Sequence, residues 1–293
     1  MSTIQPTFKL AGVMGWPIAH SRSPSIHNHW IQQHGLNGAY VLLPVDPANL
    51  QAALKGLSAL GFVGCNLTIP HKVMALSLVD RIDATARRMG AINTIVVEAD
   101  GSLSGYNNDG FGYIQSLRDA HQEWRADAGP VLVMGAGGAA RAVIVSLAEQ
   151  GAKDIRICNR TASSAHALAT EFTTEFAHAS DAVKGAMVTA VPWEKRHDAV
   201  AEVMLLVNTT SQGMGSNPAL DLSLDQLPLQ ALVSDIVYIP QETPLLKDAK
   251  ARGNPTAGGL GMLLHQARPA FNAWFGVMPE VTPALRQKVE ATL

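Results

Sequence analysis

The chain has 293 residues, of which 47% are hydrophobic and 16% charged, and its formal net charge is -2 at pH 7. This length exceeds the usual size of one domain and predicts two, and the hydrophobic content is enough for a large buried core. A charge this close to zero gives no reason to expect nucleic acid or an anionic membrane as a partner.

Strands and helices alternate from the start of the chain to about residue 120. Ser23 and Pro24 are typical of an N-cap followed by proline at the first helical position, and Gly61 is typical of a helix end. The pattern predicts strands over residues 9–14, 39–45, 62–68 and 91–97. It predicts helices over residues 23–35, 47–60 and 109–120, with a short helix after residue 70.

Residues 131–161, VLVMGAGGAARAVIVSLAEQGAKDIRICNRT, have the layout of a dinucleotide-binding βαβ unit. An apolar run over 131–134 predicts a buried parallel strand, and a glycine-rich turn follows it. The next segment predicts a helix to about Gln150, which Gly151 ends. A second apolar run over 155–158 predicts the strand that completes the unit.

The glycines of this turn suit a phosphate site. Gly135 permits the tight turn, and Gly137 lets backbone amides approach a pyrophosphate. The helix N-terminus then faces that anion with its partial positive charge. Ala140 holds the third glycine position of the motif, where alanine is an allowed variant.

The end of the second strand indicates which dinucleotide is bound. Many NAD sites place an acid about 20 residues after the glycines to hold the ribose 2'-OH. This chain has Asn159, Arg160 and Thr161 there, and a guanidinium with a hydroxyl suits a 2'-phosphate far better. We therefore predict NADP as the cofactor, bound by Gly135, Ala136, Gly137, Gly138, Ala139, Asn159, Arg160 and Thr161.

The remaining pattern is α/β as well. It predicts strands over 204–208 and 232–237 and helices over 259–275 and 283–292, while 180–201 gives the least clear pattern.

Three features bear on the cell compartment. Cys65 and Cys158 lie in apolar strand-like runs, so we expect buried free thiols in a reducing compartment. Residues 1–12 lack the basic start and apolar core of a signal peptide. No apolar run reaches the roughly 18 residues that suggest a membrane span. We therefore expect a cytoplasmic protein without a membrane partner.

Four segments outside the glycine turn carry polar side chains at strand ends or helix starts, where ligands of open α/β sheets bind. Their hydroxyls and amides are joined by Lys72 and by Asp109 at a helix start. This set suits a small polyhydroxylated molecule with one proton-transfer centre. The segments are 15–24, 66–72, 90–94 and 105–110.

With these segments the chain resembles the shikimate dehydrogenases, including the quinate/shikimate dehydrogenases. The resemblance runs from Val13 to about Phe275. It rests on six motifs in the right order, each weak alone and specific as a set: GWPIAHSRSPSIHN, NLTIPHK, GAINTI, GYNNDG, GAGGAARA with NRT, and GLGMLLHQA.

The resemblance implies a two-domain α/β fold and an activity. An N-terminal α/β substrate domain would comprise residues 1–108 and 245–293, and a Rossmann NADP-binding domain residues 109–244, with helices linking the two. Family members reversibly reduce 3-dehydroshikimate to shikimate with NADPH, a step of aromatic amino acid biosynthesis. The chain would work as a monomer or homodimer.

The resemblance also implies roles for individual residues. Ser21 and Ser23 would bind the substrate carboxylate. Lys72 and Asp109 would form the catalytic pair. The ring hydroxyls of the substrate would be bound by Thr68, Asn93 and Gln266. Because His27 and His29 do not share a face of the predicted helix, we expect solvated histidines and no metal site.

Two positions depart from the family pattern, and two other functions stay open. Ser164 stands where many NADP-dependent relatives have a second basic residue, which predicts a looser preference for NADP. Asn108 stands where threonine is common, and Tyr40 is a further candidate for a substrate contact. The alternatives are a paralogue that acts on quinate or an amino analogue, and a non-catalytic NADP-binding sensor.

Overall fold

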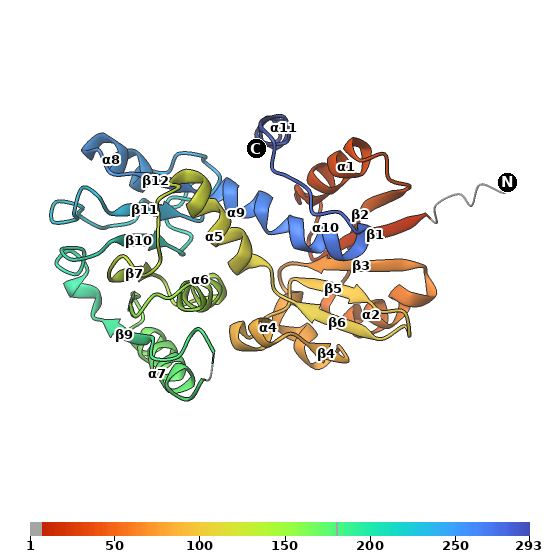
Figure 1. Ribbon diagram of the computed structural model, residues 1–293, viewed down its shortest axis with the longest axis horizontal. Coiled ribbons are helices and arrows are strands. Elements are labelled where there is room, and N and C mark those ends of the chain that lie inside the picture. The colour runs from red at the N-terminus through yellow and green to blue at the C-terminus, as the bar shows by residue number, and fades with distance from the viewer. Residues whose placement is uncertain (1–7, 180) are drawn as a thin grey trace. The chain divides into compact units, whose positions relative to one another are not determined.

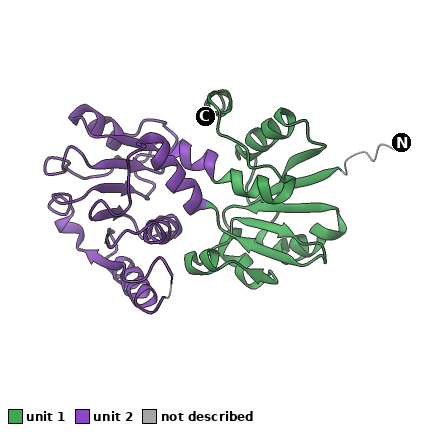
Figure 2. Cartoon of the chain, in the orientation of Figure 1, with its two compact units in different colours: residues 1–108, 266–293 green, residues 109–265 purple. Residues whose placement is uncertain are grey.

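The computed structural model describes residues 8–179 and 181–293, which divide into two compact units (Figure 2). The first unit comprises Met1–Asn108 and Gln266–Leu293, and the second comprises Asp109–His265. Each unit combines helices with one six-stranded sheet, so the predicted α/β class is confirmed. No helix in the described part of the chain is long and apolar enough to cross a membrane.

The sheet of the first unit has the strand order β2-β1-β3-β5-β6-β4 (Figure 1). Strand β1 pairs in parallel with β2 and β3, whereas β5 is antiparallel to both of its neighbours. The strands are β1 (Lys9–Gly15), β2 (Gly38–Pro44), β3 (Phe62–Leu67), β4 (Arg81–Ile82), β5 (Thr94–Val97) and β6 (Leu103–Tyr106).

Helices cover both faces of this sheet. Along β3, Cys65 and Leu67 belong to the core cluster that contains the apolar side chains of α2, while the alternate residues Gly64 and Asn66 face the other way, toward α10 and β2. The helices of this unit are α1 (Ser23–Gln33), η1 (Pro47–Asn49), α2 (Leu50–Ala59), α3 (His71–Met74), η2 (Ala75–Ser77), α4 (Ala84–Met89), α10 (Ala267–Phe275) and α11 (Pro283–Glu290).

Helix α10 is fixed to this sheet by Trp274. Its indole Nε1 donates a hydrogen bond to the Ile95 carbonyl at 3.0 Å, and the ring passes over Gly64. Gly64 has φ +152°, and a Cβ there would collide with the Ile95 carbonyl oxygen and the Trp274 ring. A glycine at this point therefore lets a helix from the end of the chain pack against β3 and β5.

The sheet of the second unit is parallel throughout, with the order β12-β11-β10-β7-β8-β9. Counted from β7 as the first strand, this is the 3-2-1-4-5-6 order of a Rossmann domain, as predicted. The strands are β7 (Val131–Met134), β8 (Asp154–Cys158), β9 (Met187–Val191), β10 (Leu205–Asn208), β11 (Leu232–Asp235) and β12 (Thr256–Gly258).

Helix α5 of the second unit packs against both α6 and α9, and α8 packs over β11 and β12 (Figure 1). Ala140, at the third glycine position, is fully buried in the first turn of α6, as close helix–strand packing requires. The helices are α5 (Asp109–Ala120), α6 (Gly138–Glu149), α7 (Ala162–His178), η3 (Trp193–Lys195), α8 (Pro244–Arg252) and α9 (Gly259–His265).

The unit boundary near the end of the chain differs from the predicted one. Residues 245–265 belong to the second unit and not to the first. The reason is strand pairing, because β12 adds to β11 as a parallel neighbour and carries α8 and α9 with it. The chain enters the first unit only at Gln266.

The single helix predicted over 259–275 is two helices, α9 and α10, which meet at Gln266. Pro269 explains the break, because it has no N–H for the carbonyl of His265, four residues earlier, and its ring crowds that carbonyl. Gln266 therefore lies at a junction and not in the middle of a helix.

The first helix also begins differently from the prediction. Ser23 is the first residue of α1 and not its N-cap, because Arg22 occupies that position without a side-chain hydrogen bond. The N–H of Ser23 donates to the Ser21 hydroxyl oxygen at 3.3 Å, so Ser21 supplies the capping oxygen.

Candidate functional site

The glycine turn after β7 forms a cradle at the start of α6. Gly135 has φ +112°, and a Cβ there would lie 2.6 Å from the Thr209 hydroxyl oxygen, so the position requires glycine. Gly137 and Gly138 are exposed, and a Cβ on either would meet nothing within 4 Å. Gly137 is the N-cap of α6, and because glycine has no side chain it leaves the first N–H groups of the helix uncapped. The first amides of a twelve-residue helix thus face open space, which fits a pyrophosphate.

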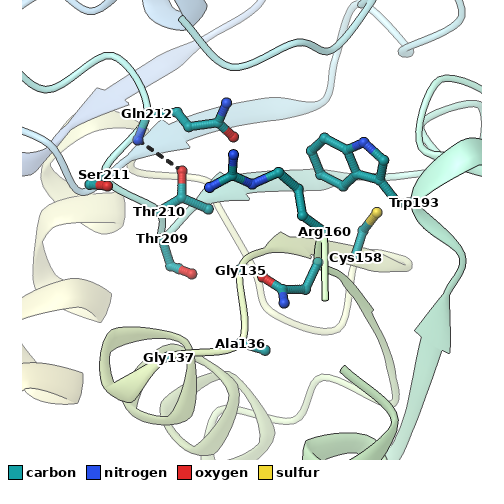
Figure 3. Close-up of a pocket in the computed structure, with 11 residues that line it drawn as sticks. Gly135, Ala136, Gly137, Cys158, Arg160, Trp193, Thr209, Thr210, Ser211 and Gln212 are labelled. Carbon is teal, nitrogen blue, oxygen red and sulfur yellow. Dashed lines mark hydrogen bonds between the residues drawn. The ribbon is translucent and has the colours of Figure 1, made fainter. Parts of the chain in front are cut away.

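A pocket of about 250 Å³ opens beside this turn in the second unit (Figure 3). Of the eight residues predicted to bind the cofactor, five line it, while Gly138, Ala139 and Thr161 do not. Its lining residues are Gly135, Ala136, Gly137, Cys158, Asn159, Arg160, Trp193, Thr209, Thr210, Ser211 and Gln212.

Arg160 provides the positive charge of this pocket. Its side chain is exposed and, among the described residues, forms no hydrogen bond or ion pair (Figure 3). The Asn159 amide donates to the Thr161 carbonyl at 3.0 Å and so fixes the turn that carries Arg160. No described Asp or Glu lines the pocket. The site therefore favours a phosphate over a bare ribose diol.

Trp193 and residues 209–212 belong to this pocket and were missed from the sequence. Trp193 lies in the segment with the least clear pattern, directly after the edge strand β9. The indole is backed by Arg196, whose guanidinium carbon is 4.7 Å from the ring centroid. The signal for the second group was present, because Thr209 and Thr210 directly follow the predicted strand 204–208.

The loop 209–212 is held by buried polar groups. Asn208 accepts from both the N–H and the hydroxyl of Thr210, at 3.0 and 2.7 Å, and its amide donates to Asp235 at 3.1 Å. Asp235 also accepts from Thr243 at 2.7 Å, and burial raises the pKa of its carboxyl group. These bonds fix the pocket wall that faces the glycine turn.

The first unit brings four of the predicted residues to one end of its sheet. Thr68 follows β3, and its N–H donates to the carbonyl of Met14 near the end of β1 at 3.0 Å. The carbonyl of Asn93 accepts from the N–H of Leu67 at 2.9 Å, so Asn93 lies beside the same strand end.

Lys72 and Gln266 join this end of the sheet. The backbone carbonyl of Lys72 in α3 accepts from Ile92 at 2.8 Å, which ties that helix to the segment before Asn93. The Asn93 amide Nδ2 donates to the Gln266 Oε1 at 3.5 Å. Residues from three distant parts of the chain therefore converge here. Asp109 belongs to the second unit, where it is the first residue of α5 and buried.

Three further predictions for the first unit concern Tyr40, the histidines of α1 and a metal site. Tyr40 is only 2% exposed, and its hydroxyl donates to Asn66 at 2.6 Å, so it is a buried residue. His27 is fully buried and stacks on Tyr40, contrary to the predicted solvated histidine, and burial lowers its pKa to about 3. Within residues 8–179 and 181–293, no three His, Cys, Asp or Glu side chains are grouped to hold a metal.

Both cysteines are buried free thiols. Burial raises the pKa of Cys65, and it raises the pKa of Cys158 to about 11. Neither thiol is therefore ionised enough near neutral pH to serve as a nucleophile.

Comparison with known proteins covers almost all of the chain. The family model of the shikimate dehydrogenase substrate binding domain matches residues 13–95, that of shikimate / quinate 5-dehydrogenase residues 119–190, and that of the shikimate 5'-dehydrogenase C-terminal domain residues 259–289. The shikimate dehydrogenase (NADP(+)) of Rhodospirillum rubrum is 50% identical over 281 residues, 96% of either chain. The chain belongs to the shikimate dehydrogenase family.

Solved structures agree with this family. Shikimate 5-dehydrogenase from Thermus thermophilus, in complex with NADP(H) and shikimate, is 35% identical, has a TM-score of 0.82, and covers 97% of this chain and 100% of its own. The 5-ketofructose reductase of Gluconobacter sp. strain CHM43 is 32% identical with a TM-score of 0.89, over 99% of this chain and 100% of its own. The fold is thus shared by enzymes named for different substrates.

Proposed function

We propose that this member of the shikimate dehydrogenase family catalyses the reversible NADPH-dependent reduction of 3-dehydroshikimate to shikimate, a step of aromatic amino acid biosynthesis. The observation that carries the proposal is the convergence of Thr68, Lys72, Asn93 and Gln266 at one end of the first sheet. A hydroxyl, two amides and one ammonium group suit a ring with several hydroxyls and one carbonyl. Family membership and the phosphate cradle of the second unit support the same reading.

The proposed chemistry divides between the cofactor and the protein. NADPH, held by the glycine turn and Arg160, supplies a hydride when bound. Lys72 stabilises the negative charge that develops on the carbonyl oxygen and gives a proton to it. Asp109 orients the Lys72 ammonium group and accepts from the same hydroxyl in the reverse direction.

The substrate carboxylate is assigned to Ser21 and Ser23. Both lie at the N-terminus of α1, an eleven-residue helix. The hydrogen bond from the N–H of Ser23 to the Ser21 hydroxyl oxygen keeps the two residues together. A helix N-terminus favours an anion, and two hydroxyl donors add direction to that attraction.

Replacing either serine by alanine is expected to raise KM for shikimate about tenfold, because each change removes a hydrogen bond to a charged group. The KM for NADP should stay within about twofold, since the cofactor residues belong to the other unit. Steady-state kinetics of Ser21→Ala and Ser23→Ala measure both values. Ser25→Ala in the same helix is the matched control, and a carboxylate bound elsewhere in a substrate complex would refute the assignment.

The function itself is tested by steady-state assays of the wild-type protein. The assays measure kcat/KM for the oxidation of shikimate, the oxidation of quinate and the reduction of 5-ketofructose, each with NADP(H) and with NAD(H). The expected result is the highest kcat/KM with shikimate and NADP. A higher kcat/KM with quinate would make the chain a quinate-using paralogue, and NADP binding without turnover of any of the three would make it a sensor.

The same proposal includes the cell compartment and the oligomeric state of the enzyme. It works in the cytoplasm on free small molecules, as a monomer or homodimer. Light scattering of the purified protein at assay concentration separates these two states, and a larger assembly would contradict both.

A further inference from the structure

Tyr40 is a buried tyrosine whose backbone, ring and hydroxyl are each held by a neighbouring side chain. The side chain of Asn28 binds both the N–H and the carbonyl of Tyr40 at 2.9 Å, which holds its backbone. The phenol ring stacks on His27, with ring centroids 4.1 Å apart and an interplanar angle of 3°. The hydroxyl donates to the Oδ1 of Asn66 at 2.6 Å. This short bond connects β2 with β3, which lie on either side of β1 in the sheet.

The bond from Tyr40 and the Asn93 carbonyl together hold the Asn66 amide in one orientation. Burial raises the pKa of Tyr40 well above its ordinary value, so the hydroxyl keeps its proton and donates it. Only Oδ1 of Asn66 can accept that proton, which leaves Nδ2 on the other side. Nδ2 donates to the Asn93 carbonyl at 3.0 Å and to the Thr94 hydroxyl oxygen at 3.1 Å.

The Thr94 hydroxyl links the side chain of Asn66 to that of Asn93 by hydrogen bonds. The Thr94 oxygen accepts from the amides of Asn66 and Asn108, at 3.1 and 3.0 Å. With both lone pairs occupied, its single proton goes to the Oδ1 of Asn93 at 2.8 Å. That Oδ1 also accepts the backbone N–H of Asn108 at 3.0 Å. The carbonyl of the Asn93 side chain is therefore saturated, and its NH₂ group is the end that reaches toward Gln266.

We propose that Tyr40 is a positioning residue that holds Asn93 in place through Asn66 and Thr94, within a network that leaves Asn93 to meet the substrate as a hydrogen-bond donor only. This proposal deepens the proposed function and rests on it. The substrate hydroxyl at Asn93 must then act as an acceptor, and its own proton goes to another acceptor such as the Gln266 Oε1. Asn108, at a position where relatives commonly have threonine, completes the relay with its side-chain amide.

The test uses Tyr40→Phe, which keeps the ring and its stack on His27 and removes only the hydroxyl. Without that donor the Asn66 side chain loses one of its hydrogen bonds, so Asn66, and through it Asn93, is held less firmly. KM for shikimate should rise about 5- to 10-fold, the size of one neutral hydrogen bond, while kcat and the KM for NADP stay within about twofold. Tyr113→Phe is the matched control, because it removes the hydroxyl of a second buried tyrosine, which lies in α5 of the other unit.

A double-mutant cycle separates the relay from a direct contact. In the Asn93→Ala background, adding Tyr40→Phe should leave KM for shikimate unchanged, because the residue through which Tyr40 acts is gone. Additive effects would overturn the proposal. They are the expected outcome if Tyr40 touches the substrate itself or acts through Ser23, whose side chain also hydrogen-bonds to Tyr40.

A spectroscopic measurement keeps the relay testable apart from the activity. The side-chain NH₂ signal of Asn93 is assigned by its loss in Asn93→Ala and compared by ¹⁵N NMR in the wild type and Tyr40→Phe. The proposal expects one sharp signal in the wild type and a shifted or broadened one in Tyr40→Phe. An unchanged signal contradicts the relay, whereas a wild type inactive on shikimate contradicts the proposed function alone.

Discussion

The Lys72→Ala variant is expected to lose about 100-fold or more in kcat, as removal of a general acid–base group does. The ammonium group of Lys72 would otherwise stabilise the developing oxyanion and supply its proton, both of which matter in the transition state only. KM for shikimate should therefore change much less than kcat. Steady-state kinetics with shikimate and NADP, at saturating concentrations of each, give the two values.

The control for this variant is Lys55→Ala, which removes an exposed lysine of α2 that takes no part in the predicted site. It should keep wild-type kcat and KM. A near-normal kcat in Lys72→Ala would show that Lys72 is not the catalytic lysine. A large rise in KM at constant kcat would instead make it a residue that only binds the substrate.

The Arg160→Ala variant is expected to raise KM for NADP about 10- to 150-fold and to leave KM for NAD nearly unchanged. Arg160 is the cation of the pocket, and only NADP has the 2'-phosphate that it would bind. Ser164→Arg should act in the opposite direction, because it adds a second cation in the first turn of α7. KM measured for both cofactors in both variants checks the prediction.

Two comparisons sharpen the result for Arg160. Arg156→Ala removes a nearby arginine of β8 that already pairs with Asp154, and it should change neither KM. The effect of Arg160→Ala should shrink at high salt, since the side chain is exposed and its charge is screened. Equal weakening of NADP and NAD would mean that Arg160 stacks on the adenine base, which the two cofactors share.

The sequence predicted elements best where one physical signal was strong. The unit from β7 to β8 was predicted almost to the residue, because β7 is a continuous apolar run, the helix is followed by a glycine, and the apolar residues Ile155, Ile157 and Cys158 mark β8. Strand β9 was missed because it is an edge strand with an exposed apolar residue, Met187, so its sequence lacks the apolar–polar alternation that marks a half-buried strand. The break at Gln266 was missed because apolar spacing continues through it, and only Pro269 marks it.

The candidate site shows the same limit. Strand ends and a family resemblance were enough to name Thr68, Lys72, Asn93 and Gln266, which the fold brings to one end of a sheet. They could not show that Tyr40 is buried, because a tyrosine in a predicted strand suits a core and a binding site equally well. The roles of these residues remain predictions, and the variants above test them.

The late entry of Gln266 into the first unit has a consequence for the order of folding on the ribosome. The second unit is continuous in sequence, so it can fold as soon as its last strand and helix have left the exit tunnel. The first unit must wait, because Trp274 and the rest of α10 complete its core. A fragment that stops before Gln266 should therefore release a folded nucleotide-binding unit attached to an unfinished partner, open to proteases and chaperones.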